Sequence, residues 1–187
     1  RGHLYTTGID SNGVYVRKST NAGNSFGQKN WIPNTSFWYP ASIAVDVNDD
    51  VYVVCTYNTQ VYLFKSTDSG ITFSVTQISD NCRIIGKDLT IDNNGTIYIA
   101  YTPSNNNNGA YLLKSINWGV SFSSIPIETN SSILAYYDFT GTIDNHDNIY
   151  IAWVEQINAN HSNVSVAKSV DGGISFKILK IPVISTQ

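Results

Sequence analysis

The residues of this chain that could do chemistry are aromatic rings, one arginine and a few acids in segments between apolar runs. Aromatic rings offer flat apolar faces to a sugar ring, and charged or amide groups bond its hydroxyls. Such a set predicts a binding site for a glycan. The alternative interpretation is that the rings seal the seams between packed sheets. The candidate ligand-binding residues are Trp38, Tyr39, Arg83, Tyr136, Tyr137, Asp138 and Glu155.

These candidates lie between four copies of one turn, in which a serine is followed by Asp or Asn, glycine and phenylalanine at fixed offsets. Asp and Asn bond nearby backbone amides, and glycine adopts a positive φ at little cost. We interpret each copy as a structural hairpin turn fastened to the core by its ring. The copies are Ser19, Asn21, Gly23 and Phe26; Ser66, Asp68, Gly70 and Phe73; Ser115, Asn117, Gly119 and Phe122; and Ser169, Asp171, Gly173 and Phe176.

The elements that position these turns are strands. The four serines are 47, 49 and 54 residues apart, a period typical of propellers. Upstream of three turns lie two strand-like blocks, and a third strand leads into each turn while a fourth leaves it. The sequence therefore predicts an all-β fold, a β-propeller of four-stranded antiparallel blades. We expect residues 1–187 to form a single propeller domain or a propeller segment, with repeats at about 1–40, 41–87, 88–140 and 141–187.

The first repeat is shorter than the others, because its alignment with the second places Arg1 in the middle of the first turn. The first blade is therefore expected to lack its innermost strand. Either the stretch Ile181 to Gln187 or another chain supplies that strand, or the chain is part of a longer propeller. Closure of four blades on themselves is the alternative.

The turn, Ser-x-Asp-x-Gly-x-x-Phe/Trp, resembles the Asp-box (BNR) motif of sialidases, sortilin-type receptors, some lectins and other secreted propellers. Two of the four copies carry Asn in place of Asp. The resemblance covers essentially the whole chain at the level of repeat architecture and implies the sialidase-like propeller fold. It implies no single function, since one fold hosts many activities.

Sialidases hold the substrate carboxylate with three arginines and use a tyrosine–glutamate pair with an aspartate. This chain has three arginines in all: Arg1 is terminal, Arg17 adjoins a turn lysine, and only Arg83 is expected on the binding face. Without a cluster of three arginines, the charge that develops during the reaction lacks its stabilising partners. We expect no complete sialidase activity, with other glycosidase chemistry on a carboxylate pair as the alternative.

Three turns between the first two strands of a blade begin with Asp46, Asp92 and Asp144 and offer oxygen ligands at alternate positions, as calcium loops do. Asx-stabilised hairpin turns explain them equally well. We expect no metal and no cofactor, with calcium as the alternative.

The composition limits the partners. Only 13% of the residues are charged and the net charge is −3, so we expect no nucleic-acid partner. The chain has no run of 18 apolar residues, so we expect no direct membrane insertion. Cys55 and Cys82 are predicted to form a disulfide, with two buried thiols as the alternative. The candidate glycosylation sites are Asn34, Asn94, Asn130, Asn160 and Asn163.

Together these features predict an extracellular or cell-surface, non-catalytic module that recognises a glycan or a cell-surface protein. One alternative is a structural subunit of an extracellular assembly, in which self-assembly by strand exchange completes the open blade. The other is a fragment of a sialidase-like glycoside hydrolase.

Overall fold

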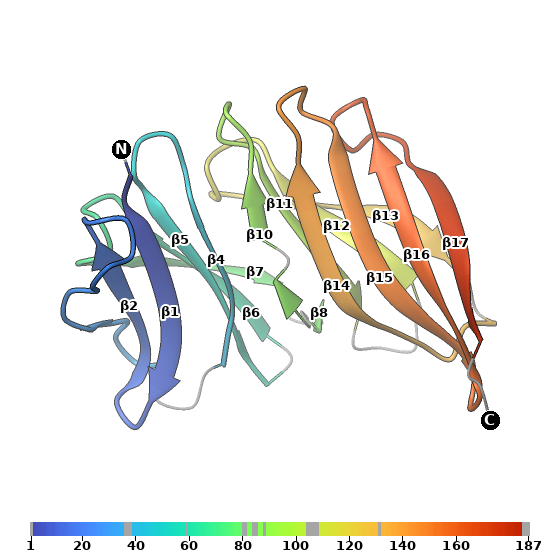
Figure 1. The fold of residues 1–187 in the computed structure, drawn as a ribbon, viewed down its shortest axis with the longest axis horizontal. Coiled ribbons are helices and arrows are strands. Elements are labelled where there is room, and N and C mark those ends of the chain that lie inside the picture. Colours follow the sequence, from blue (N-terminus) through green and yellow to red (C-terminus); the bar gives the residue numbers. More distant parts are fainter. Residues whose placement is uncertain are drawn as a thin grey trace. The chain divides into compact units, whose positions relative to one another are not determined.

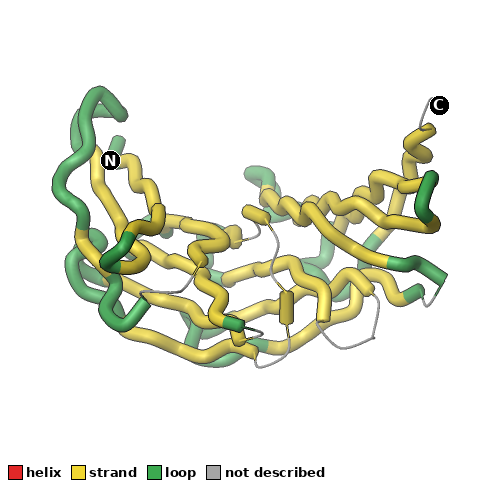
Figure 2. Tube along the Cα trace, turned by 90° about the horizontal axis from the view of Figure 1, so that it is seen from below, coloured by secondary structure: helices red, strands yellow, loops and turns green. Residues whose placement is uncertain are grey.

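The computed structural model describes residues 2–35, 39–58, 60–79, 82–83, 86–87, 89–103, 109–130 and 132–184. Those residues form strands, turns and loops but no helix (Figures 1 and 2), which confirms the predicted all-β class. Within the described ranges there is accordingly no helix long and apolar enough to cross a membrane.

The chain forms two compact units, Arg1–Asp80 and Asn81–Gln187. Each contains two sheets whose main strands are antiparallel and follow one another along the chain. Alternate residues of the central strands carry apolar side chains to a shared core, as expected for sheets packed face to face.

The first unit begins with a three-stranded sheet in the order β1-β2-β3 (Figure 1). Its second sheet has four strands in the order β4-β5-β6-β7. The predicted absence of the innermost strand of the first blade is thus confirmed. The strands are β1 (Leu4–Asp10), β2 (Gly13–Ser19), β3 (Asn30–Trp31), β4 (Tyr39–Val45), β5 (Val51–Tyr57), β6 (Gln60–Ser66) and β7 (Ser74–Ser79).

The second unit has two four-stranded blades, each extended by one two-residue strand. The third blade runs β10-β11-β12-β13, with β8 paired to β11, and the fourth runs β14-β15-β16-β17, with β9 parallel to β14. The sequence does not predict β8 and β9. The strands are β8 (Cys82–Arg83), β9 (Gly86–Lys87), β10 (Leu89–Ile91), β11 (Ile97–Pro103), β12 (Gly109–Ser115), β13 (Ser123–Thr129), β14 (Ala135–Ile143), β15 (Ile149–Asn158), β16 (His161–Ser169) and β17 (Lys177–Ile184).

The C-terminal strand bears on one of the alternatives for the strand missing from the first blade. Ile181 lies opposite Val164 and Ile184 opposite His161, so β17 pairs with β16 along its whole length. Residues 181–184 therefore complete their own sheet and do not supply the strand missing from the first blade. Residues 185–187 lie outside the described part of the chain.

Cys55 is one of the two cysteines of the candidate disulfide. Its side chain is fully buried in the apolar cluster of the first unit, beside Val14, Val16 and Val53, and its thiol is free. Burial raises the pKa of this thiol to about 12. The inward register of β5 carries Cys55 into this core, and its disulfide with Cys82 stays a prediction. The side chain of the proposed partner, Cys82, lies outside the described residues.

Candidate functional site

The four Asp-box turns share one hydrogen-bond pattern. In each, the serine hydroxyl accepts a bond from the glycine amide at 2.8–2.9 Å. The same hydroxyl donates to the Asp or Asn side chain at 2.7–2.9 Å. The Asp or Asn oxygen then accepts the backbone amide four residues further on. All these groups are engaged in hydrogen bonds within the turn, so a binding or catalytic site must lie elsewhere.

Three of the predicted ligand-binding residues cannot be placed as side chains. Trp38 lies outside the described residues, and only the backbone of Tyr39, in β4, and of Arg83, in β8, is described. Their role in binding stays a prediction.

The two adjacent tyrosines of β14 point to opposite faces of their sheet. Tyr136 lies opposite Glu155 and is 4% exposed, whereas Tyr137 lies opposite Val154 and is partly exposed. Successive strand residues alternate between faces, and the strand begins at Ala135 where the sequence predicts a loop. Tyr136 and Tyr137 therefore cannot line one site.

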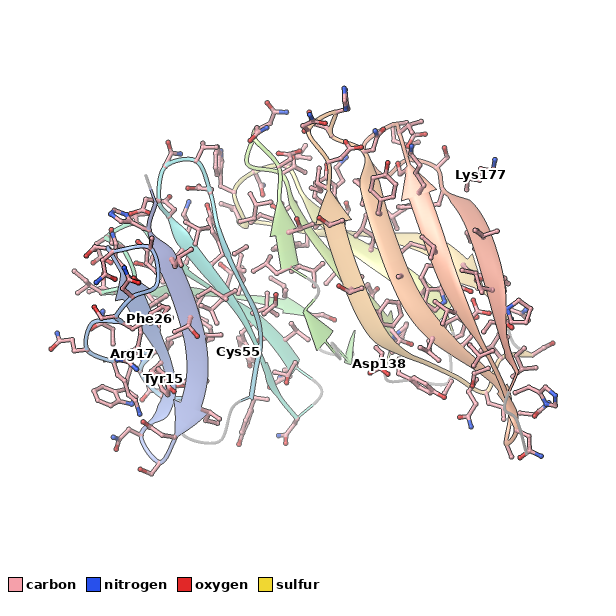
Figure 3. The ribbon with its side chains drawn as sticks, in the orientation of Figure 1. Tyr15, Arg17, Phe26, Cys55, Asp138 and Lys177 are labelled. Atoms are coloured by element: carbon pink, nitrogen blue, oxygen red, sulfur yellow. The ribbon has the colours of Figure 1, made fainter. Side chains whose placement is uncertain are left out.

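Asp138 follows at a β-bulge that shifts the register of β14 against β15. Its φ is 54°, a left-handed conformation, and its side chain is exposed. Figure 3 shows Asp138 at the end of the fourth blade away from Lys177. The bulge separates it from Tyr136 and directs it to solvent.

Glu155 is buried within β15, whereas the sequence predicts it in a segment between apolar runs. It continues the inward series Ile149, Ile151 and Trp153, and its side chain is 0% exposed. Its Oε1 accepts the Trp153 indole N–H at 3.0 Å and the Ser165 hydroxyl at 2.7 Å. Such a carboxylate is held in place by its donors and is closed to solvent.

Lys180 links Glu155 to a second carboxylate. Its Nζ lies 3.0 Å from Glu155 Oε2 and 2.6 Å from Oε1 of Glu128, at the end of β13. The Lys180 side chain is 35% exposed and that of Glu128 is 15% exposed, so these two groups form the solvent side of the cluster. We call Glu128, Tyr136, Glu155 and Lys180 the lysine-bridged cluster.

The surroundings of the two carboxyl groups shift their pKa values in opposite directions. Burial raises the pKa of Glu128, and the neighbouring Glu155 carboxylate adds to the rise despite the opposing effect of Lys180. Burial alone would raise the pKa of Glu155, but donation by Ser165, by the Glu128 carboxyl group and by Lys180 outweighs it, so the pKa of Glu155 is lowered. Glu155 is therefore the ionised partner of Lys180, and Glu128 the more readily protonated acid.

Two atoms of the cluster are buried without a hydrogen-bond partner among the described residues, Tyr136 Oη and Glu128 Oε2. Burial first, and then the Glu128 and Glu155 carboxylates, raise the pKa of Tyr136, so its hydroxyl stays protonated. A protonated hydroxyl can donate and a carboxyl oxygen can accept. The pair is thus suited to a group that does both, such as water or an alcohol.

Sequence reasoning missed Glu128 and Lys180. Lys180 shares the inward face of β17 with Ile178, which packs on the core, so a lysine at a core-facing position was an available signal. Glu128 lies opposite Ala110 only because β13 bulges one residue earlier, between the partners of Ala110 and Tyr111. No pattern in the residues of β13 predicts this bulge.

Among the described residues, Arg17 is the arginine whose side chain is placed, and its role is structural. Arg17 lies beside Phe26 (Figure 3), with its guanidinium carbon 5.9 Å from the ring centroid. It donates to the carbonyl oxygens of Gly27 at 2.8 Å and Phe26 at 2.9 Å. Its guanidinium group therefore stabilises the first Asp-box turn.

The acidic turns between the first two strands of a blade are stabilised by their own hydrogen bonds. Asp46, Asp92 and Asp144 each accept backbone amides two and four residues further on with Oδ1, and a tyrosine hydroxyl with Oδ2. Asp92 and Asp144 also border a hollow of about 210 Å³ in the second unit. Among the described residues, no group of three or more His, Cys, Asp or Glu side chains is arranged to hold a metal ion. These contacts are those of Asx turns.

The sheets and boxes define the class of protein. Antiparallel blades, three-stranded in the first repeat and four-stranded in the others, each carry the same serine-based turn and give the chain the Asp-box β-propeller fold seen in sialidase-like proteins. No protein-family model matches the chain. No curated protein matches it either.

Solved structures share this fold at low sequence identity. A protein of unknown function from Dyadobacter fermentans is 14% identical with a TM-score of 0.68, and the match covers 94% of this chain and 60% of that one. A Hadza microbial sialidase is 15% identical with a TM-score of 0.64, covering 94% of this chain and 43% of the sialidase. A GH43 β-1,3-galactosidase is 10% identical with a TM-score of 0.59, covering 96% and 73%. The chain thus spans less than two thirds of the first two.

Proposed function

We propose that this protein is a non-catalytic propeller module that recognises a glycan through the lysine-bridged cluster. The observation that carries the proposal is the buried pair of unpartnered atoms, Tyr136 Oη and Glu128 Oε2, beside the partly exposed amine of Lys180. A sugar hydroxyl both donates and accepts, so it offers the bonding function that each of these atoms needs. Leaving such buried groups unpaired costs about 1–3 kcal/mol each, which a bound hydroxyl or water would recover.

Sugar chemistry is further supported by the names of proteins with the same fold, which include a sialidase and a galactosidase. The likeness concerns the fold, and the ligand class is our proposal. The Lys180 amine is already paired with Glu155 and Glu128, so the cluster carries no net positive charge and favours a neutral sugar over one that carries a carboxylate.

Hydrolysis is disfavoured by the arrangement of the same groups. A glycosidase needs two carboxyl groups that reach the scissile bond from either side. Here Glu155 is 0% exposed, and the Lys180 amine stands within 3.0 Å of one carboxylate and 2.6 Å of the other. The position that a glycosidic oxygen would need is therefore taken by the lysine.

The test is calorimetric titration of the protein with a panel of neutral and acidic oligosaccharides. Tyr136→Phe and Glu128→Gln each remove one hydrogen-bonding function and are expected to weaken binding of the recognised glycan about 5–10-fold, the effect of one lost hydrogen bond. Tyr137→Phe is the matched control, because its hydroxyl lies on the opposite face of β14. Equal affinities for all four proteins would contradict the proposal.

We also propose an extracellular location. Of the candidate glycosylation sites, Asn34, Asn94 and Asn160 are exposed on described turns, where a sugar chain can be attached without disturbing a core. Expression through a eukaryotic secretory pathway should give a mass above 20.6 kDa that falls on enzymatic removal of N-glycans. An unmodified mass would count against this location.

A further inference from the structure

The lysine-bridged cluster holds two carboxyl groups but one amine. Lys180 Nζ lies 3.0 Å from Glu155 Oε2 and 2.6 Å from Glu128 Oε1. One ammonium group balances the charge of one carboxylate, so one negative charge is left over when both acids are ionised. The cluster can therefore pair with one further positive charge.

That negative charge does not lie on Glu155, whose two oxygens are both bonded by donors of the protein. Oε1 accepts the Trp153 indole N–H at 3.0 Å and the Ser165 hydroxyl at 2.7 Å, and Oε2 accepts the Lys180 amine. The side chain is also 0% exposed. A ligand can neither reach this carboxylate nor improve its bonding.

The excess charge is left on Glu128. Its Oε1 is paired with Lys180, but its Oε2 is buried and has no hydrogen-bond partner among the described residues. The charged groups that act on Glu128 are Glu155 and Lys180, and burial together with Glu155 raises its pKa although Lys180 opposes the rise. The ionised form of Glu128 is thus incompletely stabilised by the protein alone.

The chemistry of this oxygen selects its partner. A carboxylate oxygen only accepts hydrogen bonds, and its strongest bonds come from charged donors. A sugar amine in its ammonium form supplies such a donor and also the missing positive charge. A sugar hydroxyl supplies the hydrogen bond alone.

Tyr136 adds a second requirement. Its hydroxyl stays protonated, is buried in a side chain that is 4% exposed, and has no hydrogen-bond partner among the described residues. Its O–H therefore needs an acceptor, which an ammonium group cannot be. A sugar with a hydroxyl on the carbon beside its amine offers the donor for Glu128 and the acceptor for Tyr136 in one ring.

We propose that the glycan bound by the lysine-bridged cluster carries a free amine, as in a 2-amino-2-deoxy sugar. The ammonium group donates to Glu128 Oε2, and the neighbouring hydroxyl accepts from Tyr136 Oη. This inference rests on the proposed glycan-binding function and names the class of sugar. Sugars that carry a carboxylate are repelled by the same excess negative charge.

Calorimetric titration with matched oligosaccharides at pH 7 tests the inference. Sets with gluco and with galacto rings are used, in which position 2 carries a hydroxyl, an acetamido group or a free amine. An ionic strength of about 0.5 M largely screens attraction between exposed charges. The free-amine form should bind about tenfold more tightly than the hydroxyl form, because a charged donor makes a hydrogen bond roughly twice as strong as a neutral one.

Two variants separate the charge from the hydrogen bond. Glu128→Gln keeps the size and an acceptor oxygen but removes the charge, so the preference for the amine should fall below about twofold. Tyr136→Phe removes the hydroxyl and should weaken the amine and hydroxyl forms by similar factors, which keeps the preference. Circular dichroism of each variant shows whether the fold is kept.

Asp147→Asn is the matched control for the loss of one negative charge. Asp147 is exposed in the turn between β14 and β15, at the other end of β14 from Tyr136. Its φ is 59°, a conformation that Asn adopts readily. This variant should keep the full preference for the amine.

The outcomes distinguish this inference from the proposed function. Equal affinity of the wild-type protein for the amine and hydroxyl forms, both weakened by Tyr136→Phe, overturns the amine preference and leaves glycan binding in place. A preference that survives in Glu128→Gln, or that Asp147→Asn removes equally, also overturns it, because the attraction would then be general. Absence of binding by every form contradicts both the inference and the proposed function.

Discussion

At the scale of the residue, the serine hydroxyl of each Asp-box accepts one bond and donates another, and the acid after it determines how the turn responds to pH. Donation by the Thr72 side chain, followed by the Thr72 amide and Ser66, holds the pKa of Asp68 well below its usual value. Ser175 and Ser169 do the same for the pKa of Asp171. Asn21 and Asn117 make similar turn contacts without a titrating group.

The lowered pKa gives a pH prediction. An acid whose folded pKa lies below its unfolded value of about 4 stabilises the fold above pH 4, and this contribution is lost as the pH falls toward the folded pKa. Asp68→Asn together with Asp171→Asn should therefore flatten the loss of stability between pH 5 and pH 2. Urea midpoints measured across that range check it. An unchanged acid slope in the double variant would refute the assignment.

Lys180 is expected to matter for stability as well as for binding. Lys180→Met leaves Glu155, which is 0% exposed, without its counter-charge, and breaking a buried pair costs several kcal/mol. Because Lys180 is itself 35% exposed, we expect a smaller loss of roughly 2–4 kcal/mol in the free energy of unfolding. Chemical denaturation at pH 7 measures it.

The control is the double variant Lys180→Met with Glu155→Gln, which removes both charges and should recover part of that loss. If the single and double variants were equally unstable, packing of the lysine stem, and not its charge, would explain the effect.

At the scale of the element, the turn between β10 and β11 supports the box between β12 and β13. Gly95 has a φ of 79°, and a Cβ added there would stand 2.2 Å from the Trp118 ring. Gly95→Ala therefore demands both a strained backbone and a displaced ring, and we expect a loss of about 1–3 kcal/mol. The loss is read from the shift of the thermal midpoint.

Gly141→Ala is the comparison for that measurement. Gly141 lies in β14 without a positive φ, and an added Cβ would meet its nearest neighbour at 3.7 Å. Its stability should change by less than about 0.5 kcal/mol. Equal effects at the two glycines would show that the close approach of Gly95 to Trp118 is not a constraint.

Strands and turns were predictable because each depends on local pattern. The inward series Ile97-Ile99 and Ile149-Ile151, and the box residues, identify β11, β15 and the turns without knowledge of the fold. The orientation of Tyr136 and Glu128 was not predictable to the same degree. It depends on the start of β14 and on a bulge in β13, and a shift of one residue turns every side chain to the other face.

At the scale of the whole molecule, the repeat gives the architecture but not the site. The lysine-bridged cluster joins Glu128 of the third blade to Tyr136, Glu155 and Lys180 of the fourth. These residues are distant in the sequence and belong to no repeated motif, so only the packing of the two blades brings them together. Tyr136 and Tyr137, which were predicted to share one site, are instead divided between faces by the alternation of residues along β14.

The central claim is that the cluster recognises a glycan and does not cleave it. The most direct measurement is native mass spectrometry of the protein after incubation with a panel of free oligosaccharides, since it records bound mass and released products together. The account predicts a complex that carries the intact oligosaccharide and loses it in Tyr136→Phe. Cleaved sugar in the spectrum, or a complex unaffected by Tyr136→Phe, would contradict it.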